Sequence, residues 1–243
     1  MSAPNEIIGQ YKIIEQTGAG GMATVFKAYH ERLDRNVAVK VMHQNFSQDP
    51  DFLNRFAREA RIVARLEHPN IVPIYDYDEH NGKPYLVMKF VEGRTLKDML
   101  RKGALPLDEI MRVMPKLADA LTYAHERGVL HRDVKPSNII IDERGEPYLM
   151  DFGLARIVQG GESTMSADVM LGTPHYISPE QAQGDPDIDA RADVYSLGVI
   201  LYELVTGQVP FFGETAFAIV HKHIYAAPPS PSELNDEVPQ SVE

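Results

Sequence analysis

The sequence predicts an α+β fold, in which a small sheet-rich part is followed by a larger part that is mainly helical. Up to about Phe90 the apolar residues mostly alternate, as in strands, and after Gly93 they recur at helical spacing. The chain has 243 residues, 44% of them hydrophobic, which is enough to bury the core of one large domain or of two modest lobes. We therefore expect residues 1–92 and 93–243 to form separate units.

The sheet-rich part contains runs of β-branched and aromatic residues that favour strands. The expected strands span residues 11–18, 23–31 and 37–42, followed by two strands joined by a turn at Asn81-Gly82. Between them, residues 49–68 show the apolar spacing of a helix, with Pro50 and Asp51 at its expected start and Pro69 after its expected end.

Helices are expected in the second part. One begins after Thr95, a candidate N-cap, and ends at Gly103. A longer helix covers residues 107–128, where Pro115 should either kink the helix or fall near its start. Residues 190–207 are apolar almost all round, which predicts a helix at the centre of this part.

Composition and charge exclude several classes of function. The chain has no cysteine, so it forms neither disulfides nor cysteine-based zinc sites. Its net charge of −11 argues against non-specific binding of nucleic acid, which needs a basic surface. The N-terminus lacks the basic and apolar regions of a secretory signal, and the most apolar stretch, residues 193–207, is too short to span a membrane.

The stretch "TGAGGMATV", residues 17–25, nearly matches G-x-G-x-x-G, with Ala23 at the third glycine position. A dinucleotide fingerprint requires a helix after such a loop, but the residues that follow favour a strand. The loop is therefore expected to join two antiparallel strands, either as an ordinary hairpin turn or as a cover over phosphates. A Walker P-loop is excluded because the chain contains no G-x-x-x-x-G-K-[ST] sequence.

Two charged residues accompany this loop. Lys40 closes the strand pattern "VAVK", and Glu59 lies on the helix that follows. Each alone is typical of a charge that faces solvent. Together they could form a pair that directs the lysine to phosphates held under the glycine loop.

The most informative stretch is "HRDVKPSNIIID", followed by "YLMDFG". Two short loops between strand-like segments bring four polar residues into one region: Asp133, Lys135, Asn138 and Asp151. The oxygens of Asn138 and Asp151 suit Mg²⁺. Asp133 can orient a hydroxyl and accept its proton, and Lys135 can stabilise a phosphoryl group. The set fits phosphoryl transfer, which depends on positioning and charge neutralisation; the alternative is a pair of polar turns.

With these motifs the sequence resembles the eukaryotic-like protein serine/threonine kinases, in particular their bacterial, PknB-like branch. The motifs follow the family's order along most of the chain: "GAGGMATV", "VAVK", Glu59, "HPNIV", "HRDVKPSN", "DFG", "GTPHYISPE" and "DVYSLG". The resemblance implies a bilobal protein kinase fold. Its antiparallel-sheet N-lobe, with one long helix, would span residues 1–92, and its mainly helical C-lobe would span residues 93–243 and lack its last helices.

For the N-lobe, the resemblance implies a nucleotide site. The glycines would bring backbone amides to the ATP phosphates, and Lys40 would contact the α- and β-phosphates and pair with Glu59. Met88 would be the gatekeeper, with the backbone of Lys89 and Val91 bonded to adenine. The implied nucleotide-binding residues are Gly18, Gly20, Gly21, Val25, Ala38, Lys40, Met88, Lys89 and Val91.

For the C-lobe, the resemblance makes Asp133 the catalytic base, supported by Lys135, and makes Asn138 and Asp151 the metal ligands. Asp193 would tie the central helix to the catalytic loop.

An activation segment, residues 151–180, is also implied. Arg132 would pair with a phosphate on it, for which Thr164 is the first candidate and Ser163 and Ser166 are the others. Thr173 would brace the catalytic loop.

The sequence departs from the family pattern in three places. Ala23 replaces a glycine, and Ser178 replaces the alanine of the A-P-E element. The family's arginine partner of the A-P-E glutamate, here Glu180, lies in a segment that this sequence does not contain, so we expect Glu180 to be unpaired.

The implied activity is transfer of the ATP γ-phosphate to Ser/Thr hydroxyls of proteins, including the activation segment itself, with Mg²⁺ or, as an alternative, Mn²⁺. The expected partners are ATP, protein substrates and a second copy bound through the N-lobe, but no nucleic acid. The expected location is cytoplasmic, with no membrane segment in this chain and with a membrane anchor after residue 243. The alternatives are a pseudokinase scaffold without turnover and a small-molecule kinase, a class that lacks a segment like "GTPHYISPE".

One further motif, "HKHIY", contains His221 and His223. Residues at this spacing do not share one face of a helix. We therefore expect surface or interface histidines and no metal site.

Overall fold

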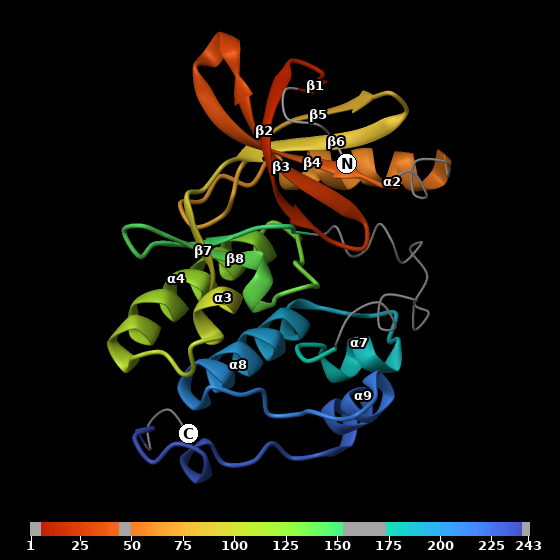
Figure 1. Ribbon diagram of the computed structural model, residues 1–243. Coiled ribbons are helices and arrows are strands. Elements are labelled where there is room, and N and C mark those ends of the chain that lie inside the picture. Colours follow the sequence, from red (N-terminus) through yellow and green to blue (C-terminus); the bar gives the residue numbers. More distant parts are fainter. Residues whose placement is uncertain (1–5, 44–49, 153–173, 240–243) are drawn as a thin grey trace. The chain divides into compact units, whose positions relative to one another are not determined.

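The computed structural model describes residues 6–43, 50–152 and 174–239 (Figure 1). The chain forms two units, Met1–Glu92 and Gly93–Glu243. The first unit holds the larger sheet and helix α2, and the second holds a small sheet and the other helices. This is the α+β architecture that the sequence predicts.

An antiparallel sheet organises the first unit, and its strands lie in the order β1-β2-β3-β4-β6-β5. The strands are β1 (Ile7–Ile8), β2 (Tyr11–Ala19), β3 (Ala23–His30), β4 (Arg35–Met42), β5 (Ile74–His80) and β6 (Lys83–Lys89). The predicted strands thus form close to their predicted bounds.

The connections between these strands use residues that tolerate a left-handed backbone. Asn81 (φ 52°) and Gly82 (φ 72°) form the predicted two-residue turn between β5 and β6, and positive φ at both positions matches the twist of a hairpin. Between β3 and β4, the 3₁₀ turn η1 (Glu31–Leu33) ends at Asp34, which is also left-handed and accepts a hydrogen bond from the Tyr29 hydroxyl.

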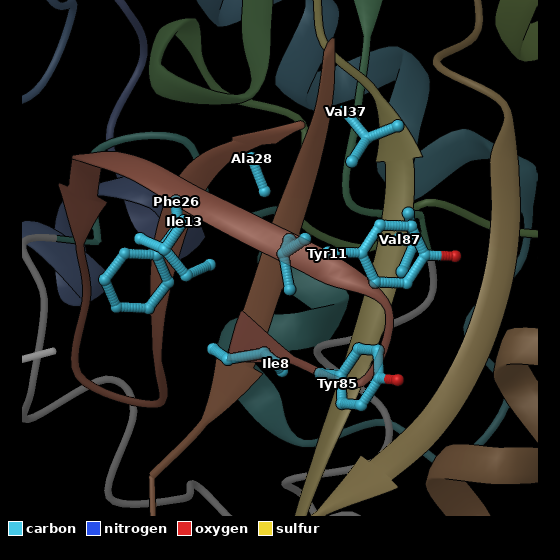
Figure 2. Close-up of a cluster of buried hydrophobic side chains, with 9 residues drawn as sticks. Ile8, Tyr11, Ile13, Phe26, Ala28, Val37, Tyr85 and Val87 are labelled. Atoms are coloured by element: carbon cyan, nitrogen blue, oxygen red, sulfur yellow. The ribbon is translucent and has the colours of Figure 1, made fainter. Parts of the chain in front are cut away.

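A buried apolar cluster of the first unit lies on one face of this sheet. Because side chains alternate along a strand, every second residue points to this face. The buried cluster consists of Ile8, Tyr11, Ile13, Phe26, Ala28, Val37, Val39, Tyr85 and Val87 (Figure 2). Each fully buried side chain of this size contributes roughly 1.5–3 kcal/mol to folding.

Helix α2 (Pro50–Val63) packs on the sheet through Phe56, whose ring centroid lies 5.5 Å from that of Tyr77 in β5. The helix ends before residue 68, where the sequence predicted its end. The amides of Arg65 and Leu66 instead donate to carbonyls three residues earlier, which tightens the chain into a 3₁₀ turn. This turn places Leu66 in the core, where it is 3% exposed.

The second unit combines a small antiparallel sheet with helices. Its strands are β7 (Gly93–Thr95), β8 (Ile139–Asp142) and β9 (Pro147–Leu149). Its helices are α3 (Leu96–Leu100), α4 (Leu107–His125), α7 (Pro179–Gln183), α8 (Ala190–Thr206) and α9 (Ala216–Tyr225), with the 3₁₀ turns η2 (Pro136–Asn138) and η3 (Pro231–Glu233). Gly93 is needed here, because a Cβ atom would lie 2.2 Å from the carbonyl oxygen of Ile141.

Most of the predicted helix signals act as expected. The Thr95 side chain accepts from the amide of Asp98 and caps α3, although this helix ends at Leu100 rather than Gly103. Helix α4 includes Pro115 well inside it rather than near its start. Helix α8 buries residues on most sides, packs against α4 and ends at Gly207 (φ 79°). The predicted central helix is therefore confirmed.

The two histidines of α9 differ from the prediction. His221 is exposed, but His223 is 3% exposed and bonds through Nδ1 to the Tyr195 hydroxyl at 2.8 Å. The expectation of two surface or interface histidines is therefore wrong for His223. Within the described ranges, no helix has the length and apolar character needed to cross a membrane, and no group of histidine and carboxylate side chains is arranged to hold a metal ion.

Candidate active site

The glycine loop is the turn of a β-hairpin. It connects β2 to β3, so a strand follows it and not the helix of a dinucleotide fingerprint. The amide of Gly20 closes the turn by donating to the carbonyl of Ala23 at 2.9 Å. A Cβ atom at Gly20 would meet its nearest neighbour at 3.8 Å, and one at Gly18 at 3.9 Å. The protein itself therefore leaves room for a Cβ atom at both glycines.

Four of the residues expected to hold adenine and phosphate share the sheet face opposite this buried cluster. Val25 of β3 pairs directly with Lys40 of β4, and Ala38 of β4 pairs with Met88 of β6. Ala38 and Lys40 point to the same face because they are two residues apart on one strand. The buried cluster takes the intervening positions Val37, Val39 and Val87, and Figure 2 labels Val37 and Val87. The structure thus brings these four predicted residues together.

The remaining predicted residues of this unit lie near the ends of elements. Glu59 is half-buried on α2, and its pairing with Lys40 stays a prediction. The amide of Lys89 donates to the carbonyl of Pro73 at 3.1 Å, so this N–H is not available to a ligand. Val91 follows β6 and is half-buried.

In the second unit, the catalytic loop is anchored by Asp193 in the first turn of α8. This residue is 1% exposed, and its carboxylate accepts hydrogen bonds from the backbone amides of His131 (2.8 Å) and Arg132 (2.7 Å). The Nε2 atom of His125 lies 2.8 Å from the same carboxylate. Burial alone would raise the pKa of Asp193, but the bonds from His125 and the two amides outweigh it and hold the pKa below its ordinary value.

Two residues of the site have a strained backbone. Arg132 (φ 65°) and Asp151 (φ 68°) are non-glycine residues in the left-handed region. Such a conformation costs about 1–3 kcal/mol and persists only where the surroundings enforce it. One of these residues directly precedes Asp133, and the other is a predicted metal ligand.

His131 connects the two loops that carry these residues. Its Nδ1 atom accepts from the amide of Asp133 at 3.2 Å, so the ring proton lies on Nε2, which donates to the carbonyl of Met150 at 2.9 Å. The ring also packs on Phe152, with centroids 4.6 Å apart. The residues on both sides of Asp151 are therefore held by the ring that orients Asp133.

The loop brings Asp133, Lys135 and Asn138 into direct contact. Lys135 Nζ lies 2.7 Å from Asp133 Oδ2, and Asn138 Nδ2 donates to the same oxygen at 2.9 Å and to the Asp133 carbonyl at 2.8 Å. The Asp133 side chain is 38% exposed, so a solute can reach it. The side-chain NH2 group of Asn138 donates to Asp133. The other side-chain atom, Oδ1, is therefore the one that can bind a cation.

The donor set fits a magnesium ion bound with phosphate. Asn138 Oδ1 and the Asp151 carboxylate are hard oxygen ligands, and Mg²⁺ characteristically takes one or two such protein ligands together with phosphate oxygens and water. The Met150 amide donates to the carbonyl of Asn138 at 3.0 Å, which ties the two ligand-bearing segments together.

The predicted activation segment is described only at its end. Thr164, Ser163, Ser166 and Thr173 lie outside the described residues. Glu180 lies at the start of α7, and its lack of an arginine partner stays a prediction.

Sequence reasoning missed three residues that shape the site: His43, His131 and Gln181. His43 contacts the glycine hairpin, and Gln181 contacts the catalytic loop. A signal for Gln181 was present, because Ser178-Pro-Glu-Gln181 matches the S-x-x-Q capping box that starts helices.

Comparisons with known proteins give the family. The model of the protein kinase domain family matches residues 11–242. The chain is 43% identical over 238 residues to serine/threonine-protein kinase PrkC of Bacillus subtilis and 40% identical over 243 residues to serine/threonine-protein kinase PknB of Mycobacterium leprae. Each match covers 98% of this chain but only 36% and 39% of the respective relative.

Solved structures agree with this assignment. The kinase domain of PknI from Mycobacterium tuberculosis superposes with a TM-score of 0.75 at 29% identity, covering 98% of this chain and 86% of that domain. The chain therefore belongs to the protein kinase domain family, in its bacterial, PknB-like branch.

Proposed function

We propose that this chain is the catalytic domain of a protein serine/threonine kinase that transfers the γ-phosphate of ATP to protein hydroxyls. The observation that carries the proposal is the Asp133 carboxylate, which is exposed to solute, held by Lys135 and Asn138, and mounted on a loop anchored to Asp193. The relatives are named as kinases, and nothing in the site favours the scaffold alternative.

In this mechanism Asp133 orients the hydroxyl of the substrate. Because Lys135 and Asn138 both contact Oδ2, Oδ1 is the oxygen that accepts the hydroxyl proton. The oxygen of the hydroxyl bonds to the γ-phosphorus as the bond to the β–γ bridging oxygen breaks, and ADP leaves. The proton moves to Asp133 late, as expected for a loose transition state.

Lys135 lies beside the base and carries a positive charge that can stabilise the transferring phosphoryl group. Asn138 and Asp151 would hold Mg²⁺, or Mn²⁺ in its place, and the metal supplies charge neutralisation for the phosphates. For this reason we assign both residues to metal binding.

For the nucleotide, we assign the glycine hairpin and the sheet face of Val25, Ala38, Lys40 and Met88. An apolar surface beside a lysine suits a purine that carries phosphates. Gly18 and Gly20 each have room for a Cβ atom in the protein alone, so we attribute their lack of side chains to a ligand that approaches the backbone.

The broader expectations are also proposals. The first is a homodimer formed through the first unit, which sedimentation with and without ATP would test. The second is a membrane-anchored full-length protein with this domain in the cytoplasm, which fractionation of cells that express the full-length protein would test.

The central test is transfer of labelled γ-phosphate to a generic protein substrate in the presence of Mg²⁺. We expect transfer by the wild type and its loss in Asp133→Asn and Asp151→Asn. Asp236→Asn is the matched control, because this aspartate is exposed in the same unit. Persistent transfer in both site variants, or ATP binding by folded wild type without any transfer, would contradict the proposal.

A further inference from the structure

Helix α7 begins with a reciprocal pair of hydrogen bonds. The hydroxyl of Ser178, a residue that is fully buried, accepts from the amide of Gln181 at 3.3 Å, and the amide of Ser178 donates to Gln181 Oε1 at 3.2 Å. A helix of one turn has little stability of its own. The conformation of α7 therefore depends on this capping box and on contacts with the rest of the unit.

The other end of the Gln181 side chain reaches the catalytic loop. Its Nε2 atom donates to the carbonyl of Arg132 at 2.8 Å. Gln181 thus uses Oε1 toward α7 and Nε2 toward the catalytic loop. It joins the end of the activation segment to the residue before the catalytic base.

The contact with Gln181 helps to fix the backbone of Arg132. This backbone is left-handed; its amide donates to Asp193 and its carbonyl accepts from Gln181. Both polar backbone groups of this residue are therefore fixed by side chains distant in sequence. Since the Arg132 carbonyl belongs to the peptide bond of Asp133, rotation of that peptide would move the amide by which Asp133 binds His131.

We propose that Gln181 is a positioning residue for phosphate transfer, which holds the orientation of Asp133 by linking the start of α7 to the carbonyl of Arg132. The inference rests on the proposed kinase activity. It also explains why glutamine stands here. A capping box accepts Glu or Gln at this position, but only Gln can also donate to the Arg132 carbonyl.

The variant Gln181→Glu isolates this contact. It keeps the size of the side chain and the acceptor for the Ser178 amide, but it places a carboxylate oxygen against the carbonyl of Arg132. Gln183→Ala is the matched control, because Gln183 lies on the same helix and is exposed. We expect Gln181→Glu to lower kcat by roughly ten- to a hundredfold with little change in the KM for ATP, and Gln183→Ala to behave as wild type.

Hydrogen–deuterium exchange gives a readout that does not depend on activity. Gln181→Glu should speed exchange at the amides of residues 131–133 while residues of α4 and α8 exchange as in wild type. Equal kcat and equal exchange at 131–133 in Gln181→Glu and Gln183→Ala would overturn the proposal, and so would a loss of protection spread evenly over the unit. If the wild type transfers no phosphate, the kinase proposal fails, and the exchange data still decide whether Gln181 holds the loop.

Discussion

The backbone amide of Arg132 donates a hydrogen bond of 2.7 Å to Asp193 Oδ1. Asp193→Asn would keep the shape of this buried side chain but replace one acceptor oxygen with an N–H group, which then faces a donor. We expect the free energy of unfolding to fall by about 2 kcal/mol. We also expect phosphate transfer to fall by about a hundredfold, because Arg132 and Asp133 lose their anchor. Urea unfolding and the labelled-phosphate assay measure the two effects.

The same carboxylate gives a prediction for acid pH. The pKa of Asp193 is lowered in the folded protein. Its contribution to the free energy of unfolding is therefore complete above the pKa of an aspartate in the unfolded chain, about 3.9, and is lost as the pH falls through the lower pKa of the folded state. Asp193→Asn should therefore lose less stability than wild type below about pH 4, whereas Asp236→Asn should follow wild type. Parallel acid-unfolding curves for wild type and Asp193→Asn would contradict this account.

His223 predicts a second pH dependence, at milder pH. Burial, followed by the nearby charge of His175, lowers the pKa of His223 from 6.5 to about 4. Because the pKa of His223 is lowered by folding, the unfolded chain takes up the proton first as the pH falls. The contribution of His223 to stability is therefore complete above pH 6.5 and is lost as the pH falls from 6.5 toward 4. The loss should reach on the order of 3 kcal/mol.

Thermal unfolding at a series of pH values tests this. The unfolding midpoint of wild type should fall more steeply through this pH range than that of His223→Gln. His221→Gln is the control, because His221 is exposed on the same helix, and it should retain the wild-type slope. An unchanged slope in His223→Gln would show that another group is responsible.

The features predicted correctly from sequence are those set by neighbouring residues. Asn81-Gly82 and Gly207 adopt the left-handed backbone that forms the hairpin turn and ends α8, and the Thr95 side chain caps its helix at an amide three residues away. The motif around Asp133 also predicted that Lys135 and Asn138 lie near it, and both contact Asp133 because they belong to one short loop, while their roles stay predictions.

The features that were missed depend on distant contacts. The burial of His223 requires Tyr195 on another helix, and the role of Gln181 requires Arg132. The left-handed backbone of Arg132 could not be predicted from the sequence either, because arginine has no preference for this conformation. Helix α2 stops early because Leu66 packs in the core, which outweighs the helical spacing of the apolar residues.

Autophosphorylation follows from the proposed activity. After incubation with Mg-ATP, mass spectrometry should find phosphate on Thr164 in the first place, or on Ser163 or Ser166. Arg132 would then provide a charge-assisted partner for the phosphate. The control is Asp133→Asn, which should stay unmodified. Absence of phosphate from residues 160–173 of active wild type would contradict the predicted switch.

His43 predicts an effect on nucleotide binding. Its ring lies 3.1 Å from the carbonyl of Gly21 through Nδ1 and 3.1 Å from the hydroxyl of Thr24 through Nε2, and its amide donates to the carbonyl of Met22 at 2.8 Å. The ring thus spans the tip of the glycine hairpin. His43→Ala should raise the KM for ATP about three- to tenfold with a smaller change in kcat. Without the histidine contacts the hairpin is more mobile, so it loses more conformational entropy when ATP binds.

His43→Gln should restore much of the affinity, since its amide can donate to one of these partners and accept from the other. Steady-state kinetics at varied ATP concentration measure both variants. A fall in kcat at constant KM would show that His43 acts on the chemical step and not on the hairpin.

Gly20 and Ala23 should respond in opposite ways to substitution. A Cβ atom at Gly20 would meet its nearest neighbour at 3.8 Å, so Gly20→Val should leave stability nearly unchanged. It should raise the KM for ATP more than tenfold, because the side chain would occupy the space that we assign to phosphate. Ala23 is 4% exposed at the start of β3, so Ala23→Gly should lower stability by about 0.5–1 kcal/mol and change the KM only modestly. Thermal unfolding and ATP kinetics on both variants separate the two effects. If Gly20→Val unfolded the protein while leaving the KM of the folded fraction unchanged, the glycine would serve the hairpin and not the nucleotide.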